Sequence, residues 1–149
     1  MWEWIVQVLS AAVGTAAFAL LFSVPPSCYL RCGVIGGLGW LCWLSLDRLG
    51  LGTVVSIFDA TALVVFCSRY SAVRRRCPVT LFLIPGIFPL VPGAGIYWTA
   101  YYVVTDQVAL AAQKGFSTLK AAVAIVLGIL LVFELPQGLF RTLAEGREK

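Results

Sequence analysis

The sequence predicts an all-α polytopic membrane protein with about five transmembrane helices, the fourth of them broken at a cluster of prolines and glycines. Apolar residues make up 60% of the 149-residue chain and charged residues only 12%, and the mean hydropathy is +0.94. A soluble domain of this length does not need so much apolar surface, so the excess is expected to face lipid. The connectors are too short to hold a soluble domain, so any activity must lie in the membrane or in a partner.

Five apolar runs approach or exceed the length that a transmembrane helix needs, about 17–25 residues. The first begins with MWEWIVQVLS, which has no Lys or Arg before its apolar stretch, so we expect a retained span and not a secretory signal. The second carries Gly33 and Gly37 at a spacing that lets helices pack closely. The third is short unless it extends toward Arg69. Residues 1–149 are thus expected to form one transmembrane domain, with spans at 4–22, 30–46, 52–69, 79–105 and 116–135 and a basic cytoplasmic tail at 136–149.

The fourth run carries three prolines and three glycines near its centre. Each interior proline removes a helical hydrogen bond and clashes with the preceding turn, at about 3 kcal/mol or more, so the helix should break. In hydrocarbon a break is tolerated only where it is buried in protein or lines a wet cavity. The half-helix after the break should aim its free N–H groups into the membrane, as discontinuous helices do when they hold a carboxylate. The pattern predicts part of a substrate pathway, or alternatively a simple kink, at Pro85, Gly86, Pro89, Pro92, Gly93 and Gly95.

Three polar side chains inside predicted spans are further candidates. Tyr97 and Thr99 follow the break, and their hydroxyls are candidate ligands for a polar substrate, whereas the later tyrosines of the run fit an aromatic belt at the membrane interface. Asp59 lies near the centre of the third run, and an intramembrane carboxylate normally faces the bundle interior or a wet cavity. Asp59 is therefore a candidate for proton coupling, with a hydrogen-bonded packing residue as the alternative.

Basic residues predict the topology through the positive-inside rule. If the fourth run crosses once, eight of the 11 Lys and Arg residues lie on one side and three on the other; a re-entrant hairpin would give seven against four. The single crossing is favoured and places the N-terminus outside and the C-terminus in the cytoplasm. Because five spans are an odd number, a homologous unit before this one would insert upside down, so the chain is expected to be half of an inverted-repeat-like transporter.

Metal, cofactor and nucleic-acid functions are not expected. The chain has no histidine, and its five cysteines are expected to be small apolar packing residues because they lack the paired spacing of a zinc site. No nucleotide-binding loop, nucleophile elbow or metalloprotease motif occurs, which argues against an enzyme. The arginines at 74–76 adjoin an apolar run, where basic residues usually report topology and not nucleic-acid binding.

Three segments carry a resemblance to a known family: FALLFSVPPS at 18–27, IPGIFPLVPGAGIY at 84–97 and LPQGLFR at 135–141. With them the chain resembles, over almost its full length, the small subunit of the threonine/serine exporter family, which corresponds to the second half of fused members. The resemblance implies a proton-driven exporter of threonine and serine, or of a dicarboxylate such as succinate, in the plasma membrane. It also implies a larger partner subunit that resembles the first half. Asp59 matches no motif of the family, and Ser23 stands where similar proteins often have asparagine.

Two classes of function therefore remain after the sequence analysis. The first is a subunit of a secondary exporter that binds a small-molecule substrate at the broken helix. The second is a channel-like or structural subunit, alone as a homo-oligomer or with a partner that binds the substrate. An exporter should saturate and respond to the proton gradient, whereas a channel should follow the substrate gradient alone.

Overall fold

The computed structural model describes residues 2–145, and all regular structure in this range is helical. Four helices are long and apolar enough to cross a membrane, and a bent pair forms a fifth candidate. The predictions of an all-α polytopic membrane protein and of a broken fourth span are therefore confirmed. The elements are α1 (Trp2–Leu21), η1 (Pro26–Cys28), α2 (Tyr29–Arg48), α3 (Thr53–Arg75), α4 (Thr80–Ile87), η2 (Phe88–Leu90), α5 (Gly93–Val104), α6 (Val108–Phe133) and α7 (Gln137–Glu145).

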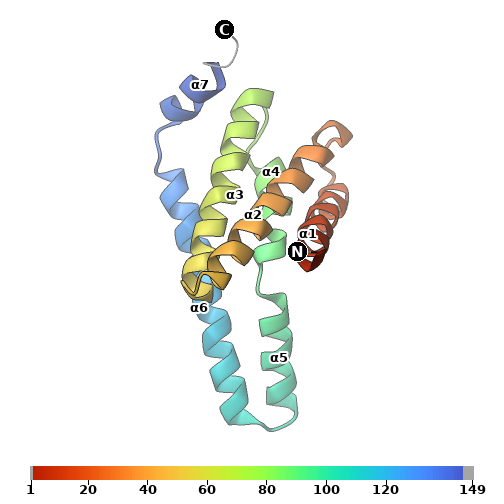
Figure 1. Ribbon diagram of the computed structural model, residues 1–149, viewed down its shortest axis with the longest axis vertical. Coiled ribbons are helices and arrows are strands. Elements are labelled where there is room, and N and C mark those ends of the chain that lie inside the picture. Colours follow the sequence, from red (N-terminus) through yellow and green to blue (C-terminus); the bar gives the residue numbers. More distant parts are fainter. Residues whose placement is uncertain (1, 146–149) are drawn as a thin grey trace.

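The helices form a bundle from which one hairpin projects. Helices α1, α2, α3 and α4 pack together, and the second half of α6 lies along α3, where Ile57 packs against Ala121 and Ala124. Helix α5 packs against the first half of α6. Figure 1 shows that the α5–α6 hairpin extends beyond the α2–α3 turn. Half of the broken span thus belongs to the bundle, and the other half belongs to the hairpin.

Glycines on α2 allow the close approach to α1 that the sequence predicted. A Cβ atom added at Gly33 would lie 3.0 Å from the Ala12 carbonyl oxygen, and one at Gly37 would lie 3.2 Å from the Ala12 Cβ. Gly36 is tighter still, since its Cβ would meet the Thr15 Oγ1 at 2.0 Å. The small-residue pair therefore packs within this chain.

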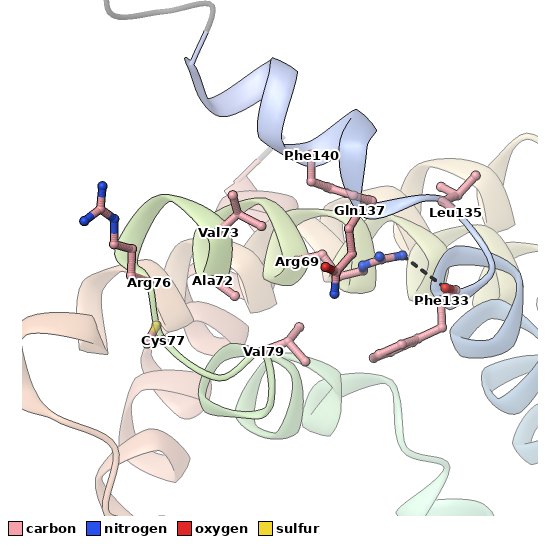
Figure 2. A pocket seen from close by; sticks show the side chains of 10 residues that line it. All are labelled: Arg69, Ala72, Val73, Arg76, Cys77, Val79, Phe133, Leu135, Gln137 and Phe140. Carbon is pink, nitrogen blue, oxygen red and sulfur yellow. Dashed lines mark hydrogen bonds between the residues drawn. The ribbon is translucent and has the colours of Figure 1, made fainter.

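Helix α7 lies in the segment that the sequence analysis assigned to the tail. Phe140 is fully buried and packs with Val65 of α3 and Val132 of α6, and Figure 2 shows it on the side of α7 that faces α3. Helix α3 also runs on to Arg75, and α6 begins at Val108, ahead of the predicted start at residue 116. Hydropathy placed these boundaries at polar residues, which end an apolar run without ending a helix.

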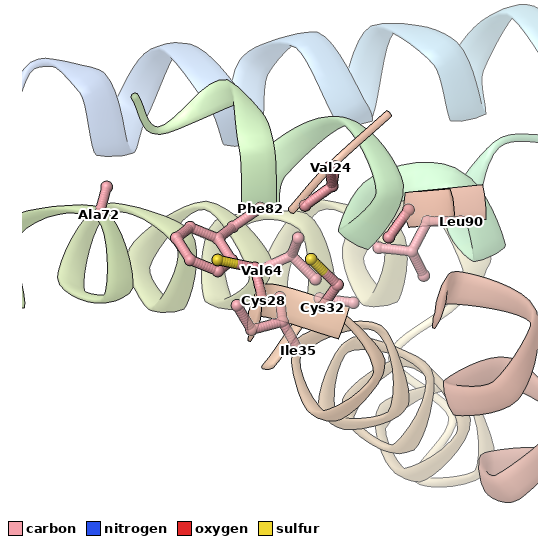
Figure 3. Close-up of a cluster of buried hydrophobic side chains, with 10 residues drawn as sticks. Val24, Cys28, Cys32, Ile35, Val64, Ala72, Phe82 and Leu90 are labelled. Carbon is pink, nitrogen blue, oxygen red and sulfur yellow. The ribbon is translucent and has the colours of Figure 1, made fainter. Parts of the chain in front are cut away.

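A buried apolar cluster fixes the first half of the broken span. Phe82 and Leu90 both lie ahead of the break and pack with Cys32 and Ile35 of α2 and with Val64 of α3 (Figure 3). Cys32 is fully buried in this cluster, as expected of a small apolar packing residue. The bundle therefore holds α4 firmly, and the break begins where this cluster ends.

Candidate functional site

The break in the fourth span occurs at Val91 and Pro92. Val91 is extended, with φ −62° and ψ 128°, because a proline disfavours the helical conformation of the residue before it. The segments 80–90 and 93–104 are bent by 50° relative to each other. A bend of this size keeps both halves running in the same general direction along the long axis (Figure 1), whereas a re-entrant hairpin would reverse the chain.

Neighbouring groups satisfy the carbonyl oxygens that the prolines leave without a helical donor. Pro85 cannot donate to the Leu81 oxygen, and the Cys32 thiol donates to it instead, at 3.5 Å from sulfur to oxygen. The next two prolines free the oxygens of Pro85 and Phe88, which accept from the backbone N–H groups of Phe88 and Val91 in tighter, 3₁₀-type bonds. The break therefore leaves none of these three carbonyl groups unpaired.

Donors at the start of α5 remain free. The Gly93 N–H donates to the Val91 oxygen at 2.7 Å. The N–H groups of Ala94 and Gly95 have no backbone partner among residues 2–145, and the first turn of a helix lacks internal acceptors for its N–H groups. Ala94 is exposed. The positive end of α5 thus presents free donors at mid-span, as the sequence predicted, and in hydrocarbon such donors cost several kcal/mol unless water, a ligand or a partner meets them.

The residues predicted to form the site separate into three groups. Pro85 and Gly86 are buried in the bundle, where a Cβ at Gly86 would lie 3.0 Å from Ile35 Cγ2. Gly95 and Thr99 lie against α6, and the Thr99 hydroxyl donates to the Gly95 oxygen at 2.7 Å.

The third group faces outward. Tyr97 is 62% exposed, and its ring stacks along the helix on that of Tyr101, with centroids 6.5 Å apart. Pro92 and Gly93 lie at the break itself, and Gly93 is exposed, with nothing within 4 Å of an added Cβ. Within the described residues these side chains do not enclose a common cavity; they mark the break and the two surfaces beside it.

Asp59 lies half-buried in α3, within electrostatic range of Cys42 on α2. Its carboxylate makes no hydrogen bond or ion pair with another described residue. The nearby Ser56 hydroxyl donates to the Gly52 oxygen instead, at 3.0 Å. The described residues therefore give the Asp59 carboxylate no hydrogen-bond partner.

Sequence analysis missed a cavity at the opposite end of the bundle from the α5–α6 hairpin, where it treated Arg69 only as a boundary charge. The cavity measures about 760 Å³ and is lined by α3, the start of α4, the end of α6 and the start of α7. Arg69 is 8% exposed and donates through Nη1 to the oxygens of Val132 and of Phe133, the latter at 3.3 Å. Its guanidinium carbon lies 4.3 Å from the centre of the Phe140 ring. The feature that could have indicated this cavity is an arginine on the buried side of a helix.

The fold and the free donors at the break define a class, that of polytopic helical membrane proteins in which one candidate span is interrupted. Residues 7–134 match the family model described as "Threonine/Serine exporter, ThrE". The chain belongs to the threonine/serine exporter family, a family of membrane transporters, which confirms the resemblance drawn from its proline- and glycine-rich segment.

One curated relative is an uncharacterized protein of Haemophilus influenzae, which is 29% identical over 91 residues. The match covers 61% of this chain and 31% of the relative, so the chain spans about a third of the length of the curated relative it matches. No solved structure matches the chain.

Proposed function

We propose that the chain is one subunit of a secondary-active exporter that moves small hydroxylated amino acids, threonine or serine, out of the cell. The observation that carries the proposal is the pair of free N–H groups at Ala94 and Gly95, at mid-span in a chain of the threonine/serine exporter family. A helix N-terminus suits a substrate carboxylate because its N–H groups and dipole both favour negative charge. The break is proposed to line the substrate route, with the Tyr97 hydroxyl beside it.

The α5–α6 hairpin supports the proposal that a partner completes the route. No residue of α5 is buried, and Trp98 and Tyr101 expose 42% and 45% of their surfaces on it. Exposed aromatic groups of this kind are frequent at protein interfaces. The proposed partner is a larger subunit that resembles the first half of the family and is related to this chain as one inverted repeat to another; a homo-oligomer is the alternative occupant.

The proposed orientation places the N-terminus outside and the C-terminus in the cytoplasm of a cell whose plasma membrane holds the protein. The 50° bend supports it, because a single crossing of the fourth span gives the larger imbalance of Lys and Arg. Asp59 is proposed as the proton-coupling group, because a half-buried carboxylate within a candidate span is costly and commonly marks a functional site.

A dicarboxylate such as succinate is the second candidate substrate. The cavity at Arg69 is lined by two arginines and by no acidic residue of the described chain, which suits two carboxylates better than a zwitterion. A channel-like or structural subunit, with substrate binding in the partner, is the alternative of a different class.

The experiment is efflux of preloaded threonine, serine and succinate from cells that express this chain alone or with its candidate larger partner. Saturable efflux that an uncoupler stops, and that needs both chains, is the expected result. Efflux that follows the substrate gradient alone would favour the channel, and the absence of efflux of all three compounds would refute the exporter.

A further inference from the structure

The cavity around Arg69 is lined by four elements and contains none of the residues at the break. Figure 2 shows the side chains of Arg69 and Gln137 turned toward each other from α3 and from the start of α7. The cavity has a volume of about 760 Å³, which is within the range of small-molecule sites, about 300–1,000 Å³. The space is therefore large enough for an organic acid or an amino acid.

The guanidinium of Arg69 places a buried positive charge at the cavity without a negative partner. More than nine-tenths of its surface is buried, yet no carboxylate among the side chains that the structure describes forms an ion pair with it. Buried arginine is ordinarily paired, because an isolated buried charge is costly. The C-terminal carbonyls of α6 and the rings of Phe133 and Phe140 stabilise the guanidinium in part.

Capping the end of α6 uses only one nitrogen of Arg69. Both bonds to the α6 carbonyls come from Nη1, while the Nε and Nη2 groups make no hydrogen bond with the described chain. Both nitrogens are reachable by solvent, because the buried side-chain atoms without a hydrogen-bond partner among the described residues are Trp40 Nε1 and Thr61 Oγ1. The remaining donors of Arg69 therefore open onto the cavity, and a guanidinium fork matches a carboxylate in two parallel hydrogen bonds.

The rest of the lining adds one neutral polar donor and is otherwise mostly apolar. Arg76, which follows α3 in a left-handed conformation with φ 54°, is also among the lining residues, but Figure 2 shows its guanidinium turned outward, away from Arg69 and Gln137. Gln137 is the first residue of α7, so an amide group and the positive end of that helix both face the cavity. The other lining residues are apolar or weakly polar: Ala72, Val73, Cys77, Val79, Phe133, Leu135 and Phe140.

We propose that this cavity binds the carboxylate of a small organic acid or amino acid, with Arg69 as the principal ligand and Gln137 as a flanking donor. On the proposed topology it opens at the cytoplasmic end of the bundle and receives the exported compound before the compound reaches the break. This placement in the transport route rests on the proposed function, whereas carboxylate binding itself does not.

The test is equilibrium binding of radiolabelled succinate and threonine to the purified full chain in nanodiscs of zwitterionic lipid. Saturable binding is expected. Unlabelled succinate and unlabelled threonine should each compete, whereas threoninamide, which lacks the carboxylate, should not. The variant Arg69→Lys should raise the dissociation constant about ten-fold or more, because a lysine lacks the fork geometry. Gln137→Ala, an exposed position whose change leaves the packing intact, should raise it about three-fold or more.

The matched control is Arg74→Gln. Arg74 lies at the same end of α3 and donates to the Tyr70 hydroxyl at 3.4 Å, but it does not line the cavity. Arg74→Gln removes a positive charge at this end of α3, a larger change in charge than Arg69→Lys makes, and should still change the dissociation constant by less than about two-fold. Three results would each overturn the proposal. They are an equal loss of binding in Arg74→Gln, binding that occurs only in nanodiscs with anionic lipid and is removed by competing phospholipid, and no binding to a folded chain.

Efflux then separates this site from the exporter function. Carboxylate binding without efflux of any compound leaves the site standing and removes the proposed function. Efflux that keeps its concentration dependence in Arg69→Lys leaves the function standing and removes the site from the transport route.

Discussion

Gly95 and Gly93 lie two residues apart in α5 and provide a matched pair for testing how the hairpin is held together. A Cβ at Gly95 would lie 2.3 Å from the Thr118 Oγ1 of α6, which is far inside van der Waals contact. A Cβ at Gly93 would meet nothing within 4 Å. Gly95→Ala should therefore force α5 and α6 apart, whereas Gly93→Ala should be accommodated.

The expected magnitude follows from three contributions. The Thr118 hydroxyl donates to the Lys114 oxygen at 2.8 Å, and moving it away costs about 1 kcal/mol. Overpacking adds about 1–3 kcal/mol, and the higher helix propensity of alanine offsets about 1 kcal/mol. Gly95→Ala should thus destabilise the hairpin by about 1–3 kcal/mol. Gly93→Ala gains only helix propensity and should stabilise the hairpin by about 1 kcal/mol or less.

Hydrogen exchange of the α5 amides in nanodiscs measures this difference locally. Protection should fall about ten-fold in Gly95→Ala, because 1.4 kcal/mol corresponds to a factor of ten in an opening equilibrium. Adding Thr118→Ala should recover part of the loss, since only a 3.2 Å contact to Cβ would remain. Equal protection in the two single variants would refute the close packing of α5 on α6.

Four further predictions concern the break and the titratable groups. Replacing Pro92 and Gly93 together with alanine should straighten the fourth span and abolish transport; transport with unchanged substrate dependence would rule out the half-helix as a site. Asp59→Asn should abolish the dependence of efflux on external pH, and an unchanged profile would return this residue to a packing role. Burial raises the pKa of the Cys77 thiol, so its alkylation should be slow near about pH 7 and still be accelerating at about pH 9, since only the thiolate reacts; an early plateau would contradict this. The Cys32→Ala variant should be about 1 kcal/mol less stable than Cys32→Ser, because only serine keeps a donor for the Leu81 carbonyl. Equal unfolding midpoints of the two variants in mixed micelles would contradict this prediction.

Hydropathy and proline placement were sufficient to predict the number of spans and the position of the break. Both depend on local properties, namely the apolar length that a bilayer demands and the hydrogen bond that a proline cannot make. The free N–H groups after Pro92 followed from the same reasoning and are present at Ala94 and Gly95.

Features that depend on tertiary contacts were not available from the sequence. The Leu81 carbonyl is satisfied by Cys32, a residue 49 positions away, so its partner could not be inferred from the proline pattern. Helix α7 gains its stability from the burial of Phe140 against α3 and α6, which composition alone does not reveal in a basic tail. Arg69 was assigned to the membrane boundary because charge counting records which side a residue lies on and not which way it faces.

The most direct test of the central claim, that the broken fourth span lines a wet route for substrate, is the reactivity of a cysteine placed at the exposed Ala94. In membranes containing this chain and its partner, Ala94→Cys should react with a charged, water-soluble thiol reagent above the level of the parent chain. Saturating substrate should slow that reaction. The control Leu127→Cys, on the exposed apolar surface of α6, should stay unreactive. An Ala94→Cys chain as unreactive as this control would contradict the account, since the free N–H groups of α5 would then face neither water nor substrate.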